Sequence, residues 1–113
     1  MDDHPKNFAY QMGADGHWRL APAFDVTFCE GPGGYHQMDV MGEALEVDRK
    51  ALVALGVQEA ELSPAAAGHV IERMCQVAAG FSTRARQLFP GQITAATLRT
   101  IQDRIDANLR QLR

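Results

Sequence analysis

Residues 2–26 read DDHPKNFAYQMGADGHWRLAPAFDV, and this stretch decides the fold that we expect for the 113-residue chain. It opens with Asp2, which is separated from Asn7 by four residues. Two short segments around a glycine-containing turn follow, and a second aspartate, Asp25, comes soon after them. The order of these features is the informative signal, because the spacing of one aspartate and one asparagine arises by chance in many chains.

A β-hairpin is predicted for residues 8–20. Phe8–Met12 and His17–Leu20 each alternate in polarity, as the residues of short strands do. Between them the glycines of segment 13–16 can supply the positive φ angles that a tight turn requires. Pro22 ends the second strand, because proline has no N–H to donate to a strand ladder.

Helices are predicted for most of the chain beyond residue 47. Asp48 and Ser63 are residue types that cap helix N-termini, and Pro64 suits a first helical position. Gly56 and Gly80 are expected to end the first two helices. The expected helices span about 48–55, 64–79, 81–89 and 94–112. A short strand is expected around residues 36–40.

The sequence therefore predicts an α+β fold that is mainly α, with a short N-terminal β-hairpin followed by a helical bundle. We expect one domain over residues 1–113, with the hairpin and its flanking aspartates in 1–26 and the bundle in 48–113. The last helix has the clearest core pattern, since five apolar residues recur at helical spacing: Leu98, Ile101, Ile105, Leu109 and Leu112.

Composition and charge exclude several classes of protein. The chain is 46% hydrophobic and 22% charged, which is typical of a globular domain. Its net charge of −3 gives no general attraction to nucleic acid. No apolar run approaches the roughly 20 residues that span a bilayer. Cys29 and Cys75 fit neither a disulfide scaffold nor a zinc ribbon, so we expect free thiols and a cytoplasmic location.

The charges are unevenly distributed along the chain. Residues up to Leu62 include 4 basic and 11 acidic side chains, whereas from Ser63 onward there are 7 basic and 3 acidic ones. Such asymmetry can mark a nucleic-acid-binding face. The simpler interpretation is that the two parts attract each other or the solvent.

Asp2 and Asn7 match the D-x-x-x-x-N pattern of a protein-kinase catalytic loop. In such a loop the aspartate accepts the proton of the attacking hydroxyl, and the asparagine oxygen binds Mg²⁺. Asp25 then stands where a second metal-binding carboxylate is needed. Alternatively, Asp2 and its neighbours form a solvated polar terminus, and Asp25 caps a short helix that begins near Val26.

Residues 2–26 resemble the C-terminal domain of HipA-like kinases, the toxins of bacterial toxin–antitoxin pairs. That family has a D-x-H-x-K-N-F segment, a hairpin and then R-L-x-P-x-Y/F-D. The matching residues here are Asp2, His4, Lys6, Asn7 and Phe8, followed by Arg19, Leu20, Pro22, Phe24 and Asp25. The helical remainder is consistent with the family but unspecific.

The resemblance implies the C-terminal lobe of a serine/threonine kinase that uses ATP and Mg²⁺. By the same resemblance Asp2 is the catalytic base, Asn7 and Asp25 are metal ligands, Lys6 contacts a phosphate and His4 shapes the loop. The Gly-rich loop and strand lysine of a kinase lie upstream of its catalytic loop, with which this sequence begins, so we expect a truncated kinase that is inactive alone.

The resemblance also implies partners, namely a protein substrate and a HipB-like helix-turn-helix antitoxin, with DNA reached only through the antitoxin. A different class of function stays open beside the kinase. The chain could serve as a non-enzymatic helical interaction module that binds the antitoxin or associates with itself through exposed apolar surface.

Overall fold

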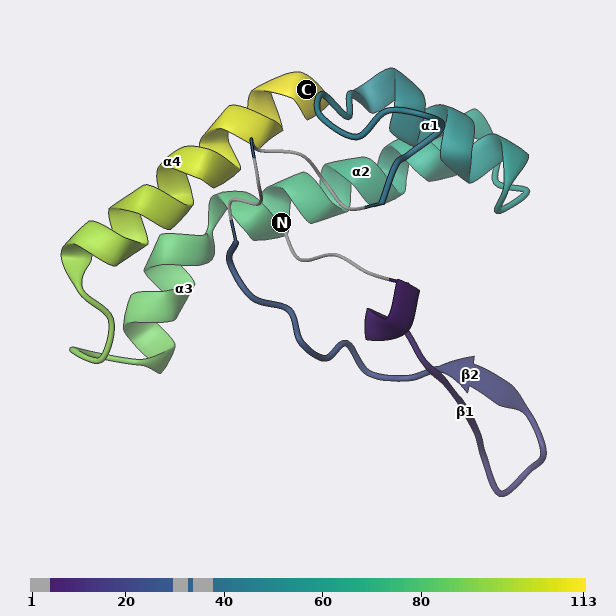
Figure 1. Ribbon diagram of the computed structural model, residues 1–113, viewed down its shortest axis with the longest axis horizontal. Helices are drawn as coiled ribbons and strands as arrows, with labels where there is room; N and C mark the ends of the chain where they lie inside the picture. The colour runs from purple at the N-terminus through teal and green to yellow at the C-terminus, as the bar shows by residue number, and fades with distance from the viewer. Residues whose placement is uncertain (1–4, 30–32, 34–37) are drawn as a thin grey trace. The chain divides into compact units, whose positions relative to one another are not determined.

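The structure is a computed structural model, and it describes residues 5–29, 33 and 38–113. Its elements run in the order η1, β1, β2, α1, α2, α3 and α4 (Figure 1). The chain divides into two compact units, Met1–Leu45 and Glu46–Arg113. The first unit contains an antiparallel two-stranded hairpin and the second contains the α-helices. This arrangement confirms the mainly helical α+β fold that the sequence predicts.

The hairpin of the first unit pairs β1 (Tyr10–Met12) with β2 (Trp18–Leu20), with Gln11 opposite Arg19 at its centre. Each strand is shorter than the alternating segment that predicted it. The existence and position of the hairpin are confirmed. Because side chains alternate across a strand, the four outer strand residues share one face, and all four are apolar: Tyr10, Met12, Trp18 and Leu20.

The strand expected around residues 36–40 lies only partly within the described residues. There, Val40 and Glu43 exchange two backbone hydrogen bonds of 2.8 and 3.1 Å. Between them Met41 and Gly42 have φ angles of 56° and 84°. Positive φ at both central residues is typical of a type I′ turn, so Val40 is the first residue of a tight turn.

Helix α1 (Arg49–Gln58) begins where its cap predicts. Asp48 is extended, and its carboxylate accepts a hydrogen bond from the backbone N–H of Ala51 over 2.7 Å. The predicted end at Gly56 is wrong, because the helix continues through Gly56 to Gln58. This glycine lies against α2 instead, and a Cβ at its position would be 2.9 Å from the Cβ of Ala67. The absence of a side chain thus allows close approach of two helices.

Helix α2 (Pro64–Ala79) follows its sequence signals at both ends. The hydroxyl of Ser63 accepts a hydrogen bond from the N–H of Ala66, and Pro64 occupies the first turn. Gly80 forms the C-cap. The helix buries one face, with Ala67, Ile71 and Cys75 inaccessible to solvent.

Helices α3 (Phe81–Leu88) and α4 (Ala95–Leu112) form a helical hairpin. Thr94 caps α4 by accepting a hydrogen bond from the N–H of Thr97. Ser82 joins the two helices, because its N–H donates to the side-chain oxygen of Gln102 and its hydroxyl donates to the carbonyl of Leu98.

The hydrophobic core of the chain lies in the helical unit. Ile71 and Cys75 of α2 pack with Leu109 of α4, and further apolar residues from α1, α2 and α4 surround them: Leu52, Val53, Ala78, Ile105 and Leu112. Leu98 is 2% exposed and is the most completely buried large side chain that the structure describes. Both predicted thiols are free, Cys75 buried and Cys29 exposed.

No helix in the described part of the chain has the length and apolar character needed to cross a bilayer.

Candidate functional site

The predicted catalytic loop ends in a short 3-10 helix, η1 (Pro5–Asn7). The N–H of Phe8 closes its turn on the carbonyl of Pro5 over 3.2 Å. Proline suits this first position, because its φ is already close to the helical value. Lys6 is exposed and Asn7 is half-buried. The other two residues predicted for the loop, Asp2 and His4, lie outside the described residues.

Hydrogen bonds and an ion pair within the hairpin stabilise its turn. The N–H of Gly13 donates to the carbonyl of His17 over 3.0 Å, and Gly16 has a φ of 76°. The carboxylate of Asp15 accepts a hydrogen bond from the N–H of His17 and forms an ion pair with Arg19. The carboxylate of Asp15 is therefore engaged in stabilising the turn, which makes Asp15 a poor candidate for a metal ligand.

Asp25 follows the hairpin in a backbone conformation that few non-glycine residues adopt. Its φ is 54°, in the left-handed region, where aspartate and asparagine are tolerated better than most other residues. Its side chain is exposed, and it makes no side-chain hydrogen bond or ion pair with the residues that the structure describes. The carboxylate is thus accessible to a ligand, whereas the exposed carboxylate of Asp15 already pairs with Arg19.

The alternative role of Asp25 as a helix cap is not supported. Residues 26–29 form no helix, and the first α-helix of the described chain begins at Arg49. Its left-handed φ also differs from the extended conformation that an N-cap residue adopts. A structural capping role therefore does not account for an aspartate at this position.

The hairpin limits how far Asn7 and Asp25 can lie from each other. The N–H of Ala21 donates to the carbonyl of Ala9 over 2.8 Å, which extends the strand pairing by one residue. Asn7 is two residues before this bonded pair and Asp25 is four residues after it. With at most about 3.6 Å of chain per residue and about 5 Å between the paired strands, the two Cα atoms lie within roughly 27 Å. The hairpin thus returns the chain towards the loop, although no described contact joins the two side chains.

The donor chemistry of these two residues suits magnesium. Mg²⁺ prefers hard oxygen ligands and is bound through one or two carboxylates together with phosphate oxygens and water. Asn7 offers an amide oxygen and Asp25 a carboxylate. Within the described residues, no group of three or more His, Cys, Asp or Glu side chains could hold a metal ion. A Mg²⁺ ion held by Asn7 and Asp25 would complete its coordination with water or phosphate oxygens.

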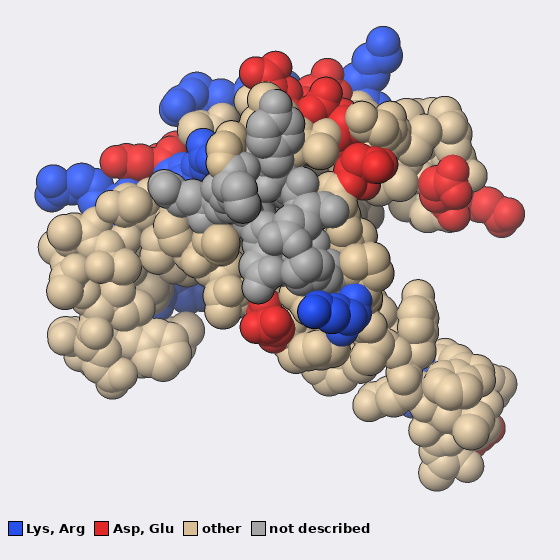
Figure 2. Space-filling model, in the orientation of Figure 1, with Lys and Arg blue, Asp and Glu red and all other residues tan. Residues whose placement is uncertain are grey.

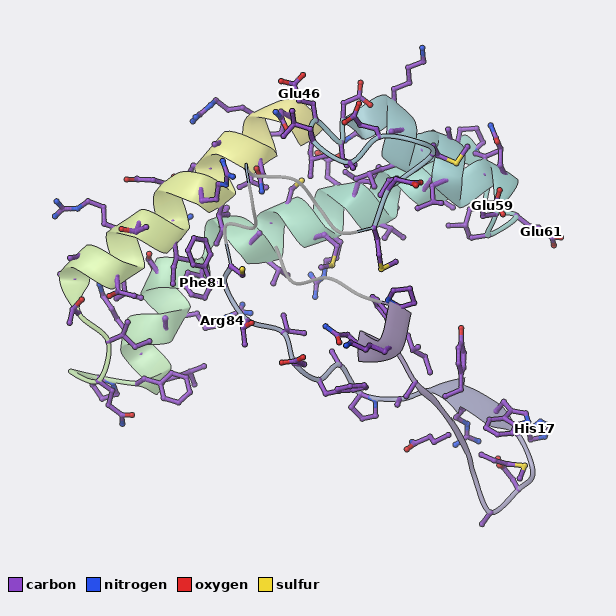
Figure 3. All side chains as sticks on the ribbon, in the orientation of Figure 1. His17, Glu46, Glu59, Glu61, Phe81 and Arg84 are labelled. Atoms are coloured by element: carbon purple, nitrogen blue, oxygen red, sulfur yellow. The ribbon has the colours of Figure 1, made fainter. Side chains whose placement is uncertain are left out.

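Neither histidine of the described chain belongs to a group of three or more His, Cys, Asp or Glu side chains that could hold a metal ion. His17 lies at the tip of the hairpin (Figure 3), where its backbone is bonded to Asp15 and Gly13. His69 is exposed on α2. His36 lies outside the described residues.

The helical unit does not present a continuous basic face in the view of Figure 2, where red and blue side chains alternate along the upper edge. The sequence of α4 explains part of this pattern, since basic and acidic residues are interspersed along it: Arg99, Asp103, Arg104, Asp106 and Arg110. This distribution favours an ordinary solvated surface over a nucleic-acid-binding face.

Comparison with known families identifies the chain. The family model of the HipA-like C-terminal domain matches residues 1–81, which include the D-x-x-x-x-N segment, the hairpin, Asp25, α1 and α2. The chain belongs to this family. No curated protein and no solved structure matches the sequence.

The region that the family model matches does not include the whole hydrophobic core. It ends at Phe81, the first residue of α3, whereas Leu98 and Leu109 of α4 are buried in the core. The helical hairpin α3–α4 therefore belongs to the same folding unit as α1 and α2, although the family model does not cover it.

Proposed function

We propose that this chain supplies the catalytic-loop and metal-binding part of a HipA-like serine/threonine kinase. The observation that carries the proposal is that one family match covers the D-x-x-x-x-N segment, the hairpin and Asp25 in a single continuous region. The accessible carboxylate of Asp25 and the half-buried amide of Asn7 support it, because both present the oxygen donors that the chemistry needs.

Each residue of the proposed site has a distinct role in phosphoryl transfer from ATP to a protein hydroxyl. Asp2 orients the attacking hydroxyl and accepts its proton. Asn7 and Asp25 hold Mg²⁺, which when bound neutralises charge on the β- and γ-phosphates. Lys6 is exposed and can place its ammonium group against a phosphate oxygen. His4 helps to shape the loop between Asp2 and Asn7.

The proposed site provides only part of the electrostatic stabilisation that phosphoryl transfer requires. A kinase also clamps the phosphates with a Gly-rich loop and a strand lysine, and such preorganised charge supplies most of the rate enhancement. The glycines at positions 31, 33 and 34 follow Asp25 and do not precede the catalytic loop. We therefore expect the 113 residues on their own to bind Mg²⁺·ATP weakly and to transfer no phosphate.

The proposed biological role is that of a toxin in a toxin–antitoxin pair. Phosphorylation of a cellular protein would arrest growth, and a HipB-like helix-turn-helix antitoxin would bind the kinase and connect it to DNA. Membership of the family supports the proposal of these partners, and a cytoplasmic location is proposed with them. They are tested separately from the metal site, by co-purification with an antitoxin encoded beside the gene.

A residue-resolved test of the site uses Mn²⁺ in place of Mg²⁺. In the presence of ATP, the paramagnetic ion should broaden the backbone amide resonances of Asn7 and Asp25. Asp25→Asn should abolish the broadening at both positions, whereas Asp103→Asn, which changes an exposed aspartate of α4, should not. Broadening confined to the helical unit, or equal broadening in both variants, would refute the assignment.

A second candidate function is a non-enzymatic protein-interaction module. The observation that favours it is the exposure of apolar side chains on α2, where Val70 and Met74 are 55% and 61% exposed. Exposed apolar surface of this kind often marks an interaction site. Two measurements on Asp25→Asn discriminate the two functions. Self-association or antitoxin binding of the module, measured by sedimentation, would be unchanged in this variant. Nucleotide binding, measured by calorimetry, would be lost.

A further inference from the structure

We draw no further inference here: the strongest candidate, the exposed apolar stripe that Val70, Met74 and Val77 form along helix α2, carries nothing because no feature of the structure shows what covers it.

Discussion

The guanidinium group of Arg49 donates a hydrogen bond of 3.2 Å to the backbone carbonyl of Leu112. This bond ties the first residue of α1 to the last residue of α4. The carbonyl at the end of a helix has no intrahelical partner and carries part of the negative end of the helix dipole, so a cation there is favourable. A second guanidinium nitrogen lies 3.6 Å from the carboxylate of Glu72 on α2.

Loss of the Arg49 side chain should therefore destabilise the helical unit more than loss of its ion pair. We expect Arg49→Met to lower the free energy of unfolding by about 1–2 kcal/mol. The substitution removes a charged hydrogen-bond donor and leaves the carbonyl at the end of α4 without this partner. Glu72→Gln should cost at most about 0.5 kcal/mol, since the Glu72 side chain is 62% exposed. Urea unfolding followed by circular dichroism at 222 nm measures both, and equal losses would show that the bond to Leu112 contributes nothing.

The contact between Gly56 and Ala67 predicts opposite effects of two glycine-to-alanine substitutions. Alanine normally stabilises a helix interior by about 1 kcal/mol relative to glycine. At Gly56 the new methyl group would meet the Cβ of Ala67 at 2.9 Å, so Gly56→Ala should destabilise the protein by about 1–2 kcal/mol through overpacking.

Gly68→Ala on α2 is the matched control. Within the described residues, a Cβ there would meet the Arg49 guanidinium at 3.5 Å, which is ordinary contact with a flexible side chain. We expect a gain of about 0.5–1 kcal/mol from helix propensity. If thermal or urea unfolding showed that both alanines stabilise, α1 and α2 would not pack as described.

Glu59 and Glu61, in the turn that joins α1 to α2, make a second matched pair (Figure 3). Glu61 has a φ of 53°, whereas Glu59 has a φ of −105°. Glu61→Gly should raise the free energy of unfolding by about 0.5–1 kcal/mol, because glycine enters the left-handed region without steric cost. Glu59→Gly should lower it by a few tenths of a kcal/mol through added flexibility of the unfolded chain. The same sign for both in urea unfolding would contradict the left-handed turn at Glu61.

The position of the core predicts which truncation folds. A chain that ends at residue 81, where the family match stops, loses Leu98 and Leu109 and exposes Ile71 and Cys75. We expect it to show no cooperative thermal transition by circular dichroism. Residues 46–113 keep every fully buried hydrophobic residue of the described chain, so this fragment should unfold cooperatively. A cooperative transition in the shorter chain would place the core elsewhere.

The sequence predicts those parts of the fold that depend on local interactions. The hairpin follows from a turn whose glycine adopts positive φ and whose aspartate bonds the next strand. The starts of α1 and α2 follow from the predicted caps Asp48 and Ser63, whose side chains bond their own first turns. The structure adds a third cap of this kind, Thr94 of α4. Each signal is contained within a few residues, so one sequence is sufficient to find it.

Features set by contacts between distant residues were not predictable in this way. Gly56 has the local character of a helix end, and only its approach to Ala67 reveals a packing role. The bond between Arg49 and Leu112 joins residues 63 positions apart. At the candidate site, the residue types of Asn7 and Asp25 pointed to metal binding, whereas the left-handed conformation of Asp25 leaves no mark in the sequence beyond its being an aspartate.

The conformation of Asp25 also determines the best variant for testing its function. Asparagine tolerates a φ of 54° as aspartate does, so Asp25→Asn should leave the fold unchanged. The substitution replaces only the charged carboxylate with a neutral amide. Asp25→Ala should instead lower stability slightly, because alanine is disfavoured in the left-handed region. Hydrogen exchange at the amide of Ala21, which donates to the carbonyl of Ala9 in the hairpin, measures this difference. Equal stability of the three proteins would argue against the left-handed geometry.

The most direct test of the central claim is calorimetric titration of the folded chain with Mg²⁺·ATP. We predict weak binding by the unaltered chain, a loss of at least about tenfold in affinity for Asp25→Asn, as expected when a direct metal ligand is removed, and unchanged binding for Asp103→Asn. The same affinity in the unaltered chain and Asp25→Asn, or no binding by a chain that circular dichroism shows to be folded, would contradict the assignment of Asp25 as a metal ligand.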